Sequence, residues 1–280
     1  MADRDLDITK FSYFSYRKLK KTLGEFDAVV ECNELAIREF IEQARKEDSK
    51  DYIKQLSLKH SVVVDRVDLD KFSSRIRQYY VTSVFQQSEQ FLQDFKKEWK
   101  QYFPNQQWQT ANTGETKLDN VLMNLSYIDI SIELIEIYDY YRLVRNYMAH
   151  TDRDLQEVVS KHSKVKNNNN KFLEGLSLFQ EPNSLDKINY SDFLILTGIV
   201  KHIAYLISTE SKPNNEEIAL ILFQKMKNED KGRAYKGIKK LKNNSDRFEK
   251  AIKNYIKTNF GRFSSKDLEL ICEQLKSLLA

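Results

Sequence analysis

The sequence predicts an all-α protein, and three of its features indicate this class. The 280 residues include only 7 Gly and 3 Pro, so few tight turns interrupt the chain. Leu, Ile, Lys, Glu and Gln are abundant, a composition that favours long helices over a β-sandwich or a doubly wound sheet. Apolar side chains also recur every three or four residues over long stretches, which is the period of a helix with one buried face.

The first hundred or so residues are predicted to form two long helices with a shorter helix between them. The long helices cover about Thr9 to Arg45 and Leu69 to Tyr102, and Pro104 ends the second. Asp48 to Lys59 is predicted to form the shorter helix. Ser61 to Val67 has the composition of a strand, but no partner strand is evident, so we interpret it as an ordered connector.

Two further helices complete a predicted four-helix bundle. After a polar loop, apolar residues step by three and four from Leu118 to Ala149. The stretch from Lys161 to Lys187 is rich in Asn and contains Pro182, which is typical of a mobile loop. The nearly apolar stretch from Tyr190 to Ile207 then predicts the fourth helix.

The run from Ser211 to Asn215 breaks the helical pattern, so we place a domain boundary there. Residues 1–211 are predicted to form the helical bundle domain, and residues 212–280 a basic C-terminal region of additional helices. These additional helices are expected over residues 216–227, 232–242, 246–259 and 265–279.

The basic residues are concentrated in this C-terminal region. From residue 212 onward there are 16 Lys or Arg against 9 Asp or Glu, a balance of +7, which leaves 29 against 32, or −3, for residues 1–211. Such a tail attracts a polyanion such as RNA through phosphate contacts that carry no sequence information. The alternative is a solvated face without a ligand. Our candidate RNA-binding residues are Lys236, Lys239, Lys240 and Lys242.

We expect a cytoplasmic protein that does not interact with membranes. Apolar stretches such as Ile218 to Phe223 are far shorter than the roughly 20 residues that a bilayer span needs. The charged first residues lead into no apolar segment of the kind that a secretory signal contains. Cys32 and Cys272 fit reduced packing thiols better than a disulfide or a metal clip.

One short segment carries residue types suited to cutting RNA without a metal ion. It reads Arg145-Asn146-Tyr147-Met148-Ala149-His150. In such cleavage the 2′-OH of the RNA attacks the adjacent phosphorus. A group that titrates near neutral pH must move protons, and a fixed cation must neutralise the charge that grows on the phosphoryl oxygens. Histidine supplies the first and arginine the second.

The spacing of this pair makes a geometric prediction. On an unbroken helix, five positions rotate Arg145 and His150 about 140° from one another. They can line one cleft if the helix ends after Ala149, where the apolar periodicity stops, or if a second copy of the chain supplies the partner residue across a two-fold axis.

On this motif, within an all-helical frame, the chain resembles the HEPN superfamily of ribonucleases over about residues 9–208. The resemblance implies a metal-independent endoribonuclease, usually a homodimer with a composite site, of a kind frequent in toxin–antitoxin and phage-defence systems. It assigns charge stabilisation to Arg145, acid–base catalysis to His150 and orientation of the RNA or of the site to Asn146. RNA and an antitoxin or regulatory protein are the expected partners, and we expect no cofactor and no metal ion.

Two other classes of function stay open. One is a catalytically inactive HEPN-like module that binds RNA, a nucleotide or a protein partner, and the other is a helical assembly protein whose basic tail docks on an acidic partner. In both, Arg145 would only form an ion pair with Asp139, Asp152 or Glu136. His150 would then be a helix C-terminal residue that the helix dipole favours.

Overall fold

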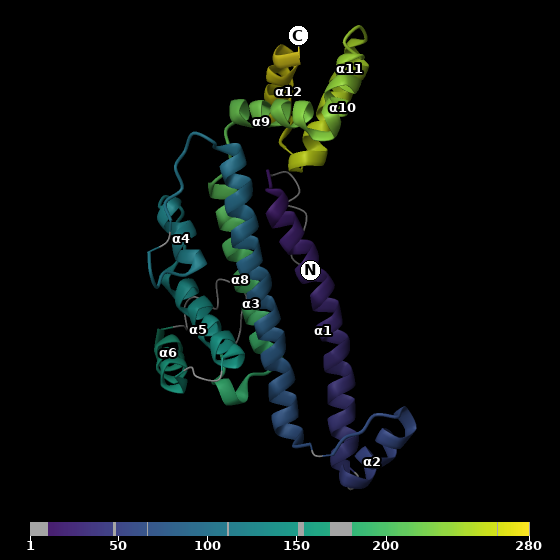
Figure 1. Ribbon diagram of the computed structural model, residues 1–280, viewed down its shortest axis with the longest axis vertical. Coiled ribbons are helices and arrows are strands. Elements are labelled where there is room, and N and C mark those ends of the chain that lie inside the picture. Colours follow the sequence, from purple (N-terminus) through teal and green to yellow (C-terminus); the bar gives the residue numbers. More distant parts are fainter. Residues whose placement is uncertain are drawn as a thin grey trace. The chain divides into compact units, whose positions relative to one another are not determined.

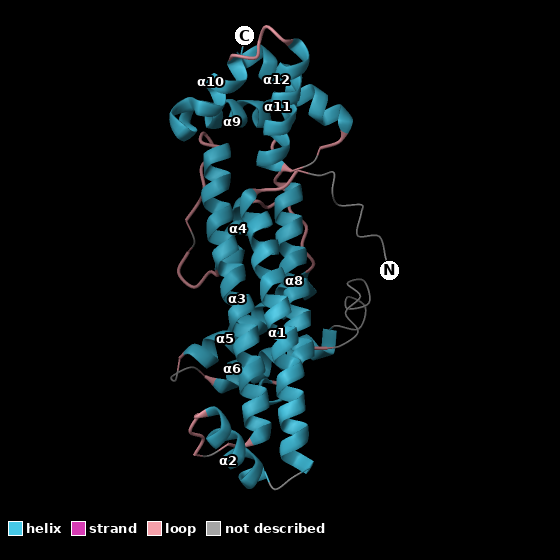
Figure 2. Cartoon of the chain, turned by 90° about the vertical axis from the view of Figure 1, so that its right-hand side faces the viewer, coloured by secondary structure: helices cyan, strands magenta, loops and turns pink. Residues whose placement is uncertain are grey.

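The computed structural model describes residues 11–46, 49–65, 67–110, 112–150, 154–168, 181–261 and 263–279. In these residues all regular secondary structure is helical, as Figures 1 and 2 show. The all-α prediction is therefore confirmed. The segment that begins at Ser61 forms no β-ladder with any described residue, and the isolated β-bridge that is found joins Phe11 to Gly261.

The chain folds into two compact units, and each is built from separate stretches of sequence. The first unit comprises Met1–Lys18, Phe91–Asp129 and Ala204–Ala280, and the second comprises Leu19–Gln90 and Ile130–Ile203. The boundary that we predicted after residue 211 falls inside the first unit. That residues 212–280 form a domain of their own stays a prediction.

Four long helices contribute to the second unit, and three of them also contribute residues to the first. They are α1 (Phe14–Lys46), α3 (Leu69–Tyr102), α5 (Ile132–Ala149) and α8 (Tyr190–Glu210). Two shorter helices, α2 (Ser49–His60) and α6 (Leu155–Asn168), complete this unit. The bounds of α3 are those predicted, and α2 and α8 differ from their predicted bounds by a few residues. Thr9, where we predicted the first helix to begin, lies outside the described residues.

Aromatic side chains hold these helices together in the core of the second unit. Phe193 of α8 is fully buried, and its ring centre lies 5.9 Å from that of Phe26 on α1 and 6.1 Å from that of Tyr80 on α3. Phe85 of α3 meets Tyr138 of α5 with ring centres 4.9 Å apart. Burial of apolar side chains of this size stabilises the fold by roughly 1.5–3 kcal/mol each.

α8 is long and apolar enough to cross a membrane by length and composition. Most of its apolar window is nevertheless buried inside the protein, and Ile199, Val200 and Ile203 are among its core residues. These contacts account for the apolar character of α8 as that of a core helix. The cytoplasmic location stays a prediction.

The prediction of one continuous helix from Leu118 to Ala149 is wrong, because two separate helices occupy this stretch. α4 (Lys117–Asn124) ends at Leu125, whose backbone is not helical, and α5 starts afresh after its N-cap Ser131. Leu125, Ile128 and Ile130 lie between the helices and are buried all the same. Apolar residues at helical spacing therefore continue through a segment that is not a helix.

The predicted mobile loop from Lys161 to Lys187 is wrong at both ends. Its first residues belong to α6, where the Lys161 ammonium pairs with Glu136 and Asp139 of α5. The residues after 180 are ordered as well, since the Pro182 carbonyl hydrogen-bonds to the His162 ring at 2.9 Å. Residues 169–180 lie outside the described residues.

The first unit contains α4 and the C-terminal helices. These are α9 (Asn215–Asn228), α10 (Arg233–Lys239), α11 (Ser245–Phe260) and α12 (Ser265–Leu279). α12 packs against both α9 and α11, and the buried residues Ile252, Ile256 and Phe260 of α11 repeat every four residues. The predicted helices of the tail are thus confirmed. α12 has its predicted bounds, whereas α10 starts one residue late, after left-handed Gly232, and ends at Lys239, three residues before the predicted end.

The prediction for the cysteines is confirmed for one of them only. Both are free, but Cys272 is buried in α12 whereas Cys32 is exposed on α1. Cys32 lies between the exposed residues Glu31 and Asn33, on a part of α1 that faces solvent. The prediction that Cys32 packs in the core is therefore wrong.

Candidate active site

Arg145 lies in the last turns of α5, and contacts from two helices fix its guanidinium group. Nη2 donates to Oε2 of Glu89 on α3 at 2.5 Å, and Nη1 donates to Oδ1 of Asn146 at 2.9 Å. The ring centre of Phe85, one turn before Glu89, lies 5.7 Å from the guanidinium carbon, within the range of a cation–π contact. Arginine has five N–H donors, and the side chain keeps 26% of its surface exposed. The guanidinium is thus both oriented and accessible.

His150 caps the C-terminus of the same helix. Its backbone is extended, with φ −131° and ψ 126°, and its N–H donates to the Asn146 carbonyl at 3.0 Å. The prediction that the helix ends after Ala149 is therefore confirmed. The His150 side chain is exposed, so its imidazole is open to a ligand.

The structure does not pair Arg145 with the carboxylates that we considered as its structural partners. Asp139 and Glu136 accept hydrogen bonds from cations of α5 and α6 instead. Asp152 lies outside the described residues. Glu89 of α3, to which we assigned no role from the sequence, is the carboxylate that holds the guanidinium.

The Asp139 carboxylate belongs to a network that joins α5 to α6. It accepts from Nε of Arg142 at 2.6 Å and from Nζ of Lys161 at 2.7 Å. Burial disfavours the ionised form of Asp139, but the hydrogen bonds from Lys161 and Arg142 outweigh burial and lower its pKa.

The lysines that we predicted to bind RNA are all exposed. Lys236 and Lys239 lie in α10, Lys240 is its C-cap, and Lys242 follows in a turn. The four lysines belong to the first unit, whereas Arg145 and His150 belong to the second. The structure therefore assigns the two sets of predicted residues to different units.

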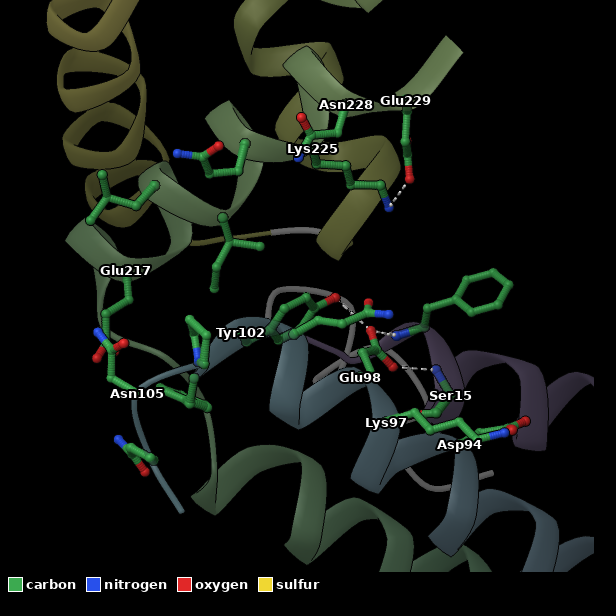
Figure 3. Close-up of a pocket in the computed structure, with 18 of the residues that line it drawn as sticks. Ser15, Asp94, Lys97, Glu98, Tyr102, Asn105, Glu217, Lys225, Asn228 and Glu229 are labelled. Carbon is green, nitrogen blue, oxygen red and sulfur yellow. Dashed lines mark hydrogen bonds and ion pairs between the residues drawn. The ribbon is translucent and has the colours of Figure 1, made fainter. Parts of the chain in front are cut away.

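A cavity of about 1000 Å³ is lined by residues of the first unit alone and includes none of the predicted site residues (Figure 3). In its wall Glu98 accepts hydrogen bonds from the N–H groups of Phe14 and Ser15 at 2.7 and 2.8 Å. Glu98 thereby caps the N-terminus of α1. Lys225 in the same wall pairs with Glu229. Because these charged groups satisfy one another and the backbone, the cavity indicates no class of ligand.

From the sequence we assigned no role to Glu89, because nothing in the spacing of the chain marks it as a partner of Arg145. Glu89 is 56 residues from Arg145 and sits in an aromatic-rich helix. Only the packing of α3 on α5 brings the two side chains together. Glu89 lies one turn after Phe85 on the same face of α3, and this shared face is the one feature of the sequence that could have indicated a contact with α5.

Neither metal-binding geometry nor similarity to known proteins assigns a chemistry to the site. No group of three or more His, Cys, Asp or Glu side chains that could hold a metal ion is found within the described ranges. Comparison of the chain with family models, with curated proteins and with solved structures gave no match. The function must therefore be argued from the residues themselves.

Proposed function

We propose that the protein is a metal-independent endoribonuclease of the HEPN type, which acts as a toxin or an anti-phage effector. One observation carries the proposal: an arginine that Glu89 and Asn146 hold in place lies five positions before an exposed histidine at the end of the same helix. A fixed guanidinium and an accessible imidazole are the two groups that cleavage by the RNA's own 2′-OH requires.

The proposed reaction forms one bond to phosphorus and breaks another. The 2′-oxygen bonds to the adjacent phosphorus, the bond to the 5′-oxygen breaks, and the products are a 2′,3′-cyclic phosphate and a 5′-OH. The proton of the 2′-OH must leave and the 5′-oxygen must gain one. The imidazole of His150 performs one of these transfers, and His150 of a second copy performs the other if the active form is a homodimer.

Arg145 stabilises the extra negative charge of the transition state in this proposal. Its planar fork suits two phosphoryl oxygens, and its charge persists at any working pH. Glu89 and Asn146 act as positioning residues, because each binds the guanidinium and neither needs to touch the RNA.

The test is an incubation of purified protein with RNA in excess EDTA, followed by analysis of the product ends. We expect 2′,3′-cyclic phosphate ends, and we expect Arg145→Ala to lower the cleavage rate by at least 100-fold. Arg142→Ala is the matched control, since Arg142 lies one turn earlier on α5 and binds Asp139. Intact RNA, or equal loss of activity in both variants, would contradict the proposal.

The Glu89–Arg145 pair also suits a second candidate function, a HEPN-like module that binds RNA without cutting it. A salt bridge that satisfies the guanidinium is sufficient for a purely structural role. In that case the wild-type protein retains RNA in a gel-shift assay, and the RNA stays intact at every enzyme concentration.

A further inference from the structure

A sharp reversal of the chain brings an aromatic residue of α10 next to one of α9. The reversal is the segment η2 (Glu229–Gly232), in which Asp230, Lys231 and Gly232 have φ values of 48°, 54° and 73°. A Cβ at position 232 would also lie 3.3 Å from the Lys227 carbonyl oxygen. Both the positive φ and this close contact therefore favour glycine at position 232.

The two aromatic rings meet at an edge and remain partly exposed. The ring centres of Phe223 and Tyr235 are 6.0 Å apart with an interplanar angle of 73°. Nζ of Lys227 lies 4.2 Å from the centre of the Phe223 ring but 5.7 Å from that of Tyr235. The ammonium therefore covers Phe223 much more closely than Tyr235.

A second ammonium group lies at the hydroxyl end of Tyr235. Nζ of Lys239 is 3.1 Å from the Tyr235 hydroxyl oxygen and 5.3 Å from the ring centre. These two distances place the ammonium beyond the hydroxyl group rather than over the ring. Tyr235 is thus flanked by two cations, and its side chain remains partly exposed.

The surroundings of these rings carry a large excess of positive charge. From Lys225 to Lys257 the chain has 12 Lys or Arg against 4 Asp or Glu, a balance of +8. The i,i+4 ion pairs found in this stretch use Lys225 and Lys253. Lys227, Lys236 and Lys240 are exposed in this stretch, so a polyanion would relieve the repulsion among its positive charges.

Aromatic rings among lysines suit one kind of polyanion in particular. Unpaired bases stack on aromatic side chains while lysines neutralise the phosphates between them. An acidic peptide would use the lysines but gain nothing from the partly exposed ring, and the bases of a duplex are not free to stack on it. The α9–α10 surface is defined here by Phe223, Lys227, Tyr235, Lys236, Lys239 and Lys240.

We infer that the α9–α10 surface binds single-stranded RNA without sequence preference, with a base stacked on Tyr235 and phosphates on the lysines. This deepens the proposed function by adding a substrate-binding site in the other unit of the chain. It does not require that the protein cut RNA.

The stacking arm of the test uses fluorescence anisotropy with a labelled oligouridylate, and all proteins carry His150→Ala so that the RNA stays intact. We expect Tyr235→Ala to weaken binding about 5-fold or more. Tyr127→Ala is the control, because Tyr127 is an exposed tyrosine of the same unit with Glu210, an acidic residue, as its charged neighbour. Equal affinity of the Tyr235→Ala and Tyr127→Ala proteins would overturn the inference.

The charge arm measures how affinity depends on salt. Replacing Lys227, Lys236 and Lys240 together with alanine should reduce the slope of log affinity against log salt by about 2, since each phosphate contact on a single strand contributes about 0.7. The control removes three exposed lysines of α2, namely Lys50, Lys54 and Lys59. Thermal unfolding of each variant checks that the fold is intact.

Polyglutamate serves as the competing ligand that separates RNA from an acidic protein partner. If polyglutamate binds as tightly as the oligouridylate and Tyr235→Ala leaves both affinities unchanged, the surface is an acidic-peptide site and the inference is wrong. Cleavage by the protein with intact His150 is assayed separately, so failure of RNA binding at this surface and failure of the nuclease proposal are distinguishable.

Discussion

The carboxylate of Glu89 lies against the guanidinium of Arg145, although the two residues are 56 positions apart and come from different helices. Phe85, one turn earlier on α3, contacts the same guanidinium with its ring. One face of α3 therefore supplies both a negative charge and an aromatic ring to the guanidinium of Arg145. This relationship makes Glu89 a residue whose removal should affect function through Arg145.

Glu89→Gln should lower the rate of RNA cleavage about 10- to 100-fold, because a loosely held guanidinium no longer sits where charge develops. The amide keeps an oxygen that can accept a hydrogen bond but loses the charge. The single-turnover rate should fall much more than the RNA affinity. A purely structural role of Glu89 would not produce this difference between rate and affinity. Glu133→Gln, at the other end of α5, is the control. Equal rates for the two variants would show that Glu89 does not position Arg145.

Asp192→Ala should be among the most destabilising substitutions in the second unit. The fully buried carboxylate accepts hydrogen bonds from the Tyr141 hydroxyl at 2.9 Å and from the N–H groups of Asn183 and Asn189 at 2.8 and 2.9 Å. Each buried donor left without a partner costs about 1–3 kcal/mol. Urea unfolding should therefore show a loss of about 3 kcal/mol or more for Asp192→Ala and a smaller loss for Tyr141→Phe. The reverse order would contradict this account of the network.

The Asp139 network predicts a loss of stability in acid. Hydrogen bonds from Lys161 and Arg142 outweigh burial and lower the pKa of Asp139 in the folded protein. A lowered folded pKa means that this contribution to stability is present above the unfolded value of about 3.9 and is lost as the pH falls through the folded value. Asp139→Asn should thus reduce the free energy of unfolding by about 1 kcal/mol at pH 7.

Urea unfolding at several pH values tests this prediction. The stabilities of wild-type protein and Asp139→Asn should approach one another as the pH is lowered below about 4, because the wild-type carboxyl group is then protonated. A difference that stays constant over this range would show that the ionised carboxylate contributes nothing.

Helices with one continuous apolar face could be predicted closely from sequence. α3 and α12 have their predicted bounds because their patterns are regular and end at clear signals, such as Pro104 two residues after α3. α6 was missed because Asn-rich composition suggested a loop, whereas ion pairs from Lys161 to α5 stabilise the helix. Local composition carries no information about such a contact between helices.

The candidate site was predictable only where it is local. Arg145 and Asn146 contact one another, and His150 follows them at the C-cap because the helix ends where the apolar pattern stops. The roles of Glu89 and of the Tyr235 ring are not predicted from the sequence, although Lys236, Lys239 and Lys240 of the α9–α10 surface are. The first depends on the packing of two helices, and the second on three consecutive left-handed residues that turn α10 back on α9.

The most direct test of the nuclease proposal compares two exposed histidines at helix ends. His150 caps α5 and His60 ends α2, so alanine at either position removes a similar side chain from a similar place. In excess EDTA, His150→Ala should cut RNA at least 100-fold more slowly than the wild-type protein, as expected for loss of an acid–base group, while His60→Ala keeps the wild-type rate. Cleavage by His150→Ala at the rate of His60→Ala would contradict the assignment of His150 as the acid–base group.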